Sequence, residues 1–291
     1  MVDSDFDTVF HLERALRALP EGPYLRGSGE RLLHPGALFA SSLTKVLQRI
    51  QTVTESFALR LSHDDVMNDW PRISGAIEAM LLALESHHDN LETILDAIST
   101  SENKRLTLEL RKQLAALFKE LVRRPVNQLK HGAHTVRPYS YFNSTFCLHG
   151  YFVCGLRDDG SIGPTVRAHG TSGSGWSLNA TVRRVLAILI RSAQTIFHVL
   201  PTPHPKRQLG GVPTAYAKTL RSICDWLAAN PPFCFPNEVR IPMPSVAVEN
   251  DLPIVRLQTL KRLRDVQTQG VRVAVSYTAD GHHRSYKLPS T

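Results

Sequence analysis

Residues 73–98 read ISGAIEAMLLALESHHDNLETILDAI, and this stretch decides the fold class. Apolar side chains recur in it every three or four positions, which is the repeat of one face of an α-helix. They are Ile73, Ile77, Met80, Leu81, Leu84, Leu91, Ile94, Leu95 and Ile98. The pattern predicts a long amphipathic helix that packs against other helices.

Similar spacing occurs on both sides of this stretch, at 39–61 before it and at 106–121 after it. The polar link at 99–103 is short, so we expect the helices that it joins to lie antiparallel. Residues 6–19 predict a shorter helix ending at Pro20. Helical spacing returns at 176–200, where a helix too apolar to stand alone is expected to complete the bundle. A last helix is expected around 216–227.

The repeat changes between residues 137 and 168, where aromatic and β-branched side chains dominate. The sequence Asp158-Asp159-Gly160 predicts a turn between strands at 151–156 and 162–166, which together form a β-hairpin. The C-terminal sixty residues favour further strands. These are expected at 238–241 and 245–248, and as a hairpin of 271–277 with 284–288.

These patterns predict a mainly α protein, α+β overall: an antiparallel helical bundle with a β-hairpin insertion and a small β-containing C-terminal region. The expected division follows the changes of period. It assigns 1–136 to the main part of the bundle, 137–175 to the hairpin insertion and linker, 176–230 to the closing helices, and 231–291 to the β-rich C-terminal region.

Charge is distributed unevenly along the chain. Residues 1–100 hold 8 of the 34 Lys and Arg and 15 of the 26 Asp and Glu, a balance of −7. The remainder has a balance of +15, and its densest basic stretch is 104–137. Arg outnumbers Lys 25 to 9, which suits bidentate phosphate contacts. The asymmetry favours a polyanionic partner such as nucleic acid, although most charge runs are solvated helix faces.

Other classes of site find little support in the sequence. The four cysteines show neither CxxC spacing nor a zinc-finger arrangement, which fits a reducing, cytoplasmic location. The acidic start and the lack of a run of about 18 apolar residues argue against export and membrane insertion. The adjacent pairs His87-His88 and His282-His283 are expected at the surface and are unsuited to sharing one metal ion. We expect no metal site and no cofactor.

The stretch RRPVNQLKHG, residues 123–132, carries the candidate chemistry. Pro125 is expected to kink or restart the helix, and Arg124, Asn127 and His131 then share one helical face. His131 could deprotonate a ribose 2′-hydroxyl while Arg124 stabilises the charge on the phosphate oxygens, with Asn127 orienting either group. Further contacts to nucleic acid are expected from Arg123, Lys130, Arg137 and Tyr139.

A long antiparallel helical pair that ends in Arg-x6-His, with an Asn before Lys-His-Gly, resembles the HEPN superfamily (higher eukaryotes and prokaryotes nucleotide-binding domain). The resemblance covers 36–136 together with 176–200. It implies a metal-independent endoribonuclease, as in toxins and antiviral defence effectors, with Arg124 and His131 as the catalytic pair. It also implies an RNA substrate, a site composed across a homodimer, and an antitoxin or other defence-system protein as a partner.

Two departures from the family pattern and three alternatives stand beside this interpretation. The family commonly has a polar residue after the Arg, where this chain has Pro125, and the minimal bundle lacks the β-hairpin. A second Arg-x6-His pair, Arg191 and His198, occurs by chance on a core helix. Arg124 and His131 could merely solvate a helix end. The chain could also be a non-catalytic nucleic-acid-binding or protein-interaction module, or a scaffold that pairs through its helices.

Overall fold

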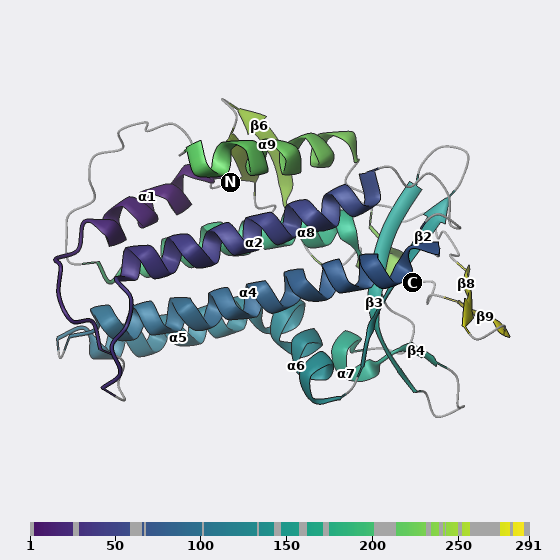
Figure 1. Cartoon of the computed structure of the whole chain (residues 1–291), viewed down its shortest axis with the longest axis horizontal. Coiled ribbons are helices and arrows are strands. Elements are labelled where there is room, and N and C mark those ends of the chain that lie inside the picture. The colour runs from purple at the N-terminus through teal and green to yellow at the C-terminus, as the bar shows by residue number, and fades with distance from the viewer. Residues whose placement is uncertain are drawn as a thin grey trace.

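Two long antiparallel helices, α2 (Pro35–Ala58) and α4 (Trp70–Ile98), run along the molecule in the computed structural model (Figure 1). The chain then returns along α4 as α5 (Lys104–Phe118). The structure describes residues 3–25, 29–58, 66, 68–100, 102–132, 134–142, 147–156, 162–170, 175–200, 214–230, 234–238, 241, 243–249, 252–256, 274–279 and 282–287.

Three further helices close the bundle. Helix α8 (Leu178–Phe197) contacts α1 (Asp7–Arg17) and α5, while α9 (Thr214–Ala229) packs on α2. Side chains of α8 are buried at consecutive positions from Leu178 to Arg183 and from Val185 to Ile190, so this part of the helix is covered on almost every side, whereas Arg191 near its end is exposed. The prediction that this helix completes the bundle is therefore confirmed. None of the described helices has the length and apolar character needed to cross a bilayer.

The fourth predicted helix ends early and restarts. After α5 the chain makes one π-helical turn, Lys119–Arg123, and continues as α6 (Arg124–His131), which leaves the bundle below α4 (Figure 1). Pro125 stands in the first turn of α6, where its missing N–H costs no hydrogen bond. In a continuous helix the same ring would clash with the preceding turn. The expected kink at Pro125 is confirmed as a change of helix direction.

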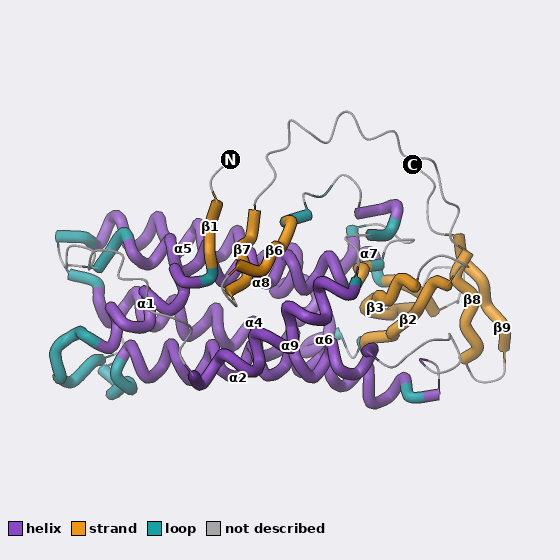
Figure 2. Tube along the Cα trace, turned by 90° about the horizontal axis from the view of Figure 1, so that it is seen from above, coloured by secondary structure: helices purple, strands orange, loops and turns teal. Residues whose placement is uncertain are grey.

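The predicted β-hairpin belongs to a larger antiparallel sheet at one end of the bundle (Figure 2). Strand β3 (Cys147–Leu156) pairs with β4 (Ile162–Pro164), as expected. It also pairs with β2 (Val136–Phe142) and with the short β5 (Trp176–Ser177), which were not predicted. The prediction extended the hairpin to residue 166, but Val166 begins the one-turn helix α7 (Val166–His169).

The described strands of the C-terminal region belong to two separate sheets. Strand β7 (Leu252–Arg256) lies between β6 (Ser245–Glu249) and β1 (Asp3–Asp5), so residues near the N-terminus pair with residues far along the chain. Strands β8 (Ala274–Ala279) and β9 (His282–Lys287) form the predicted second hairpin. The mainly α fold class with its β-containing parts is thus confirmed. The four-part division of the chain remains a prediction.

Of the strand predicted at 238–241, Glu238 instead ends a 3-10 turn, Pro236–Glu238, and residues 239–240 lie outside the described part of the chain. The Glu238 side chain is fully buried and accepts an ion-pair contact of 2.8 Å from the Arg184 guanidinium. Its second oxygen accepts the backbone N–H groups of Ser177 and Phe235, at 2.8 and 3.2 Å. Burial raises the pKa of the Glu238 carboxyl, and these donors oppose the rise. A strand would point alternate side chains outward, whereas this turn directs Glu238 into the core.

Replacing this buried carboxylate should destabilise the fold strongly. The substitution Glu238→Ala leaves the nearly buried Arg184 without its partner, for which we expect a loss of about 3–5 kcal/mol in the free energy of unfolding. Urea denaturation measures it. As a control, Glu109→Ala removes an exposed pair with Lys112 and should cost less than about 1 kcal/mol. Equal small losses in both variants would contradict the anchoring role of Glu238.

Candidate functional site

The three predicted catalytic side chains lie on the outer side of α6. Pro125 and Val126 are its buried residues, whereas Arg124, Asn127 and His131 are exposed. Positions i, i+3 and i+7 share a helical face, so the three can approach one ligand together. The three residues share this exposed face because the helix restarts at Arg124 and includes all of them.

Arg124 already has a partner on the surface. Its Nη1 donates to Glu120 Oε2 at 2.5 Å, and the two side chains are 43% and 63% exposed. An exposed pair of this kind is worth about 0–1 kcal/mol. A phosphate group, which binds a guanidinium through two parallel hydrogen bonds, can therefore displace Glu120 at small cost.

Asn127 and His131 are available to a ligand. Among the described residues, neither side chain makes a hydrogen bond or ion pair. An exposed imidazole without a partner can accept a proton from an approaching hydroxyl group. The exposed face therefore combines one cation, one amide and one potential base.

Two contacts from α4 fix α6 and the strand that follows. Lys130 Nζ lies 3.2 Å from Glu85 Oε2, a carboxylate that is only 10% exposed. Further along α4, Ser74 Oγ donates to the carbonyl oxygen of Val136, and Glu78 Oε1 accepts the N–H of the same residue. Polar side chains along one helix thus hold both ends of the segment between α6 and β2. Lys130 serves this attachment as well as adding positive charge.

The predicted contribution of Tyr139 must be corrected. Its side chain is 2% exposed and stacks on the ring of Phe235, with a centroid distance of 4.7 Å. Phe152 packs against it as well. The Tyr139 side chain points from β2 into the core. Its ring is therefore enclosed and cannot stack on a nucleobase.

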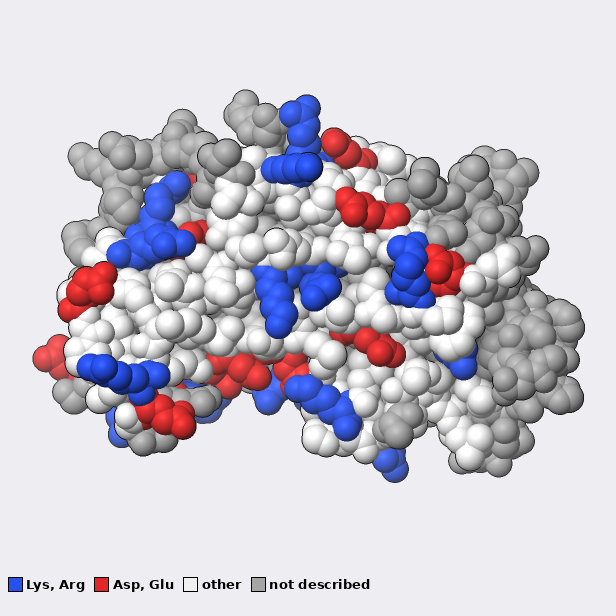
Figure 3. Space-filling view, in the orientation of Figure 1, with Lys and Arg blue, Asp and Glu red and all other residues white. Residues whose placement is uncertain are grey.

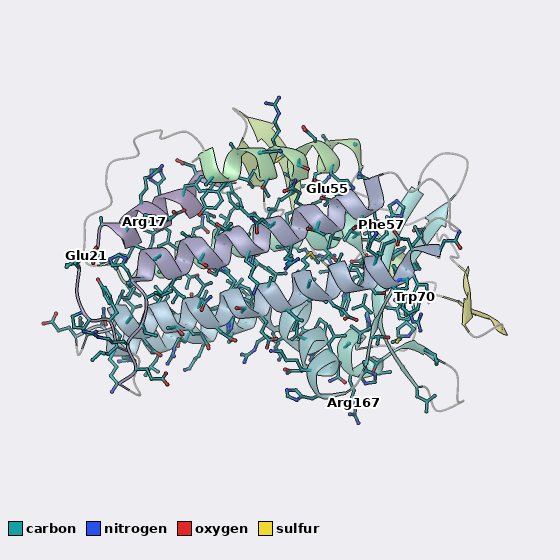
Figure 4. All side chains as sticks on the ribbon, viewed as in Figure 1. Arg17, Glu21, Glu55, Phe57, Trp70 and Arg167 are labelled. Atoms are coloured by element: carbon teal, nitrogen blue, oxygen red, sulfur yellow. The ribbon has the colours of Figure 1, made fainter. Side chains whose placement is uncertain are left out.

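Arg137 is held by an aromatic ring rather than left free at the surface. Its guanidinium carbon lies 3.8 Å from the ring centroid of Trp70, which stands at the start of α4 beside the strands (Figure 4). A cation–π contact of this type stabilises the pairing by about 0.5–2 kcal/mol. Arg123 is half-buried at the end of the π-helical turn. Of the predicted basic contacts, Arg123 and Lys130 lie next to the candidate face, and Arg137 packs on Trp70.

The structure adds two residues that the sequence did not indicate. Arg167 is exposed on α7, which packs against α6, and points away from the bundle (Figure 4). His134 packs its ring against Gly132, where an added Cβ would lie 2.4 Å from it. Arg167 is distant along the chain and gave no sequence signal. The short spacing of His131 and His134 in KHGAH could have indicated the second histidine.

The basic stretch 104–137 is partly neutralised by acidic residues. Arg111 Nη2 lies 2.6 Å from Asp96 of α4, and Lys130 pairs with Glu85 of the same helix. On the face seen in Figure 3, acidic and basic side chains are interspersed rather than gathered into one patch. The acidic first hundred residues therefore shield part of the basic stretch, and the open cations near α6 are fewer than the sequence suggests.

The surface location predicted for His87 and His88 was wrong, since both are buried on α4. His87 Nδ1 lies 2.8 Å from Ser42 Oγ, and burial lowers its pKa to about 3. Burial likewise lowers the pKa of His149 to about 4 and that of His169 to about 3. Because the rings of His87, His149 and His169 are enclosed, they cannot reach an external substrate as bases. The exposed ring of His131 on α6 is accessible to such a substrate.

The chain matches no protein-family model, and neither the curated proteins nor the solved structures include a significantly similar one.

The buried histidines predict a loss of stability in mild acid. In the unfolded chain their pKa is near 6.5, so below that pH the unfolded state binds protons that the folded state excludes. Their contribution is fully present above about pH 6.5 and falls by about 1.4 kcal/mol per pH unit for each such histidine as the pH decreases. Urea denaturation at several pH values between 7 and 5 measures this slope. In His87→Gln the slope of the free energy of unfolding against pH should become shallower by the amount that corresponds to one bound proton. An unchanged slope would contradict the lowered pKa of His87.

Proposed function

We propose that this protein is a metal-independent endoribonuclease of the HEPN type, with its site on the outer face of α6. The observation that carries the proposal is the exposed grouping of Arg124, Asn127 and His131 on a short helix that Pro125 turns away from the bundle. The resemblance of the sequence to the HEPN superfamily points to the same pair, Arg124 and His131.

The reaction assigned to this face is an internal transesterification. His131 removes the proton of a ribose 2′-hydroxyl, whose oxygen then attacks the adjacent phosphorus. The bond from phosphorus to the 5′-oxygen of the next nucleotide breaks, and water supplies the proton that this leaving oxygen takes. The products are a 2′,3′-cyclic phosphate and a 5′-hydroxyl, and no metal ion takes part.

Arg124 and Asn127 complete the site. The Arg124 guanidinium leaves Glu120 and binds the non-bridging oxygens, where negative charge accumulates in the transition state. Asn127 lies between the two on the same face and orients the phosphate or the imidazole. Arg123 and the exposed Arg167 of α7 attract the flanking phosphates.

The resemblance also supports proposals about partners. Two copies of the chain that face each other through α6 would place two Arg–His pairs around one strand of RNA. An exposed ribonuclease site would damage cellular RNA, so an antitoxin or other defence-system protein would need to cover it in the cell. Both partners belong to the proposal and stand or fall with it.

Replacing the proposed base should abolish cleavage. In His131→Ala we expect RNA cleavage to fall by about 10²–10⁴-fold, since general base catalysis contributes this much. Product formation from a labelled RNA, followed with and without EDTA, measures it. The matched control is His198→Ala, directly after α8, which removes the exposed histidine of the second Arg-x6-His pair and should leave the rate unchanged. Cleavage that survives His131→Ala, or that requires a divalent ion, would refute the proposal.

The alternative is a nucleic-acid-binding module without catalysis. It is favoured by the exposure of His131, because acid–base catalysts more often lie where water is excluded. In that case RNA would be retained but not cut.

Binding of RNA should depend on salt through a small number of phosphate contacts. The slope of the logarithm of the binding constant against the logarithm of the salt concentration reports the number of phosphate contacts. For each of Arg124→Ala and Arg167→Ala we expect this slope to become shallower by the amount that corresponds to about one phosphate contact. Lys112→Ala, in an exposed pair on α5, should leave the slope unchanged. Fluorescence anisotropy with a labelled single strand measures it. Equal slopes in all three variants would show that α6 and α7 do not contact the nucleic acid.

A further inference from the structure

The His88 ring is enclosed but incompletely satisfied. It is 0% exposed and lies against the Phe118 ring of α5, with centroids 4.8 Å apart. Among the described residues, neither ring nitrogen has a hydrogen-bond partner. A buried polar group in this condition costs about 1–3 kcal/mol. Its neighbour His87 differs, because that ring is bonded to Ser42.

Two carboxylates stand beside this ring. Asp89 Oδ1 lies 3.5 Å from His88 Nδ1, and Glu92 Oε1 lies 3.9 Å from Nε2. Both separations exceed that of a good hydrogen bond. One ligand atom from each of the three residues lies within 4.8 Å of the others. Residues 88 and 92 are one turn apart, which places them on the same side of α4.

We propose that His88, Asp89 and Glu92 form a site for a divalent transition-metal ion, of which Zn²⁺ fits best. A neutral imidazole nitrogen and two carboxylate oxygens are ligands that zinc accepts, with water in the fourth position. The nitrogen ligand argues against Ca²⁺ and Mg²⁺, which prefer oxygen alone. Two carboxylates beside the buried ring also favour a cation of charge two.

The exposure of the two carboxylates leaves room for them to close around an ion. Zinc lies about 2.0–2.2 Å from nitrogen and oxygen ligands, so the carboxylates must move closer to the ring. Their side chains are 60% and 31% exposed, which leaves them room to change rotamer. The His88 ring cannot move in the same way, because Phe118 and the rest of the core enclose it. It is the fixed point to which the carboxylates close.

The site is separate from the face proposed for RNA cleavage. It lies one helical turn beyond Glu85, the α4 carboxylate that pairs with Lys130 of α6. Neither Arg124 nor His131 belongs to it. The metal would stabilise the α4–α5 pair, because it binds the folded arrangement of residues 88, 89 and 92 and not the unfolded chain. Its existence does not rest on the proposed function.

Metal binding to the full chain tests the proposal. Protein stripped with a chelator and then dialysed is titrated with ZnCl₂ in a calorimeter, and the thermal midpoint is recorded with and without the ion. We expect one tight site per chain and a higher midpoint with zinc. In Glu92→Gln and Asp89→Asn the affinity should fall by more than the roughly 10–100-fold caused by losing an outer-shell partner. These partly exposed positions keep the test valid even if His88→Gln fails to fold.

The controls separate this site from adventitious binding by surface histidines and carboxylates. His198→Gln and Glu102→Gln change exposed residues elsewhere and should keep the single tight site. No tight 1:1 binding by the unmodified chain would overturn the proposal. So would equal affinities in Glu92→Gln, Asp89→Asn and the two controls. In either case Asp89 and Glu92 are only polar neighbours of the His88 ring.

Discussion

The enclosure of α8 is the constraint on which the rest of the structure depends. From Leu178 to Ile190 this helix is buried on almost every side, so several elements must cover it, and α1, α5, β3 and β7 all contact it. It also carries polar residues whose groups need partners once water is removed. Arg183 meets this need through Asn179 and the carbonyl oxygens of Leu227 and Asn230, at the end of α9.

The same requirement ties the C-terminal region to the bundle. Arg184 needs a carboxylate in a nearly buried position, and Glu238 supplies it from a turn beyond α9. Glu238 also accepts the N–H of Ser177, at the start of α8, so the two segments are fixed to each other. The region after α9 is therefore attached through buried hydrogen bonds as well as through the pairing of β7 with β1.

The candidate face on α6 arises from a local restriction. After Phe118 the chain leaves α5 through a π-helical turn, and it restarts as α6 with Pro125 in the first turn, where the ring is tolerated. Outside the bundle, the side chains of the new helix need not be apolar. Irregular helical turns of this kind are frequent near functional sites, which accords with the proposed role of α6. Contacts from Glu85 and Glu78 of α4 hold the displaced segment at a fixed distance from the core.

Tertiary contacts change the environment of several charged residues and histidines from the one that the sequence suggests. Seen as a sequence, 104–137 is a basic stretch, yet Asp96 and Glu85 neutralise two of its cations. The pair His87-His88 looks like a polar patch on a helix surface. Both rings are buried, because the apolar face of α4 is wider than its Leu and Ile positions indicate and extends to the side covered by α5.

The sequence by itself determined the helices, because an apolar spacing of three to four residues is a local property of the chain. Burial of the apolar face then stabilises each helix. The sequence predicted α4, the return at 99–103, the closing helix α8, the restart at Pro125, and the common face of Arg124, Asn127 and His131. Only the tertiary structure decided which strands pair, since β1 with β7 and β2 with β3 join segments by long-range hydrogen bonds. It also enclosed Tyr139, placed Arg167 beside α6, and put Glu238 into a core turn. Those outcomes depend on what lies opposite each side chain, and no periodicity along the chain carries that information.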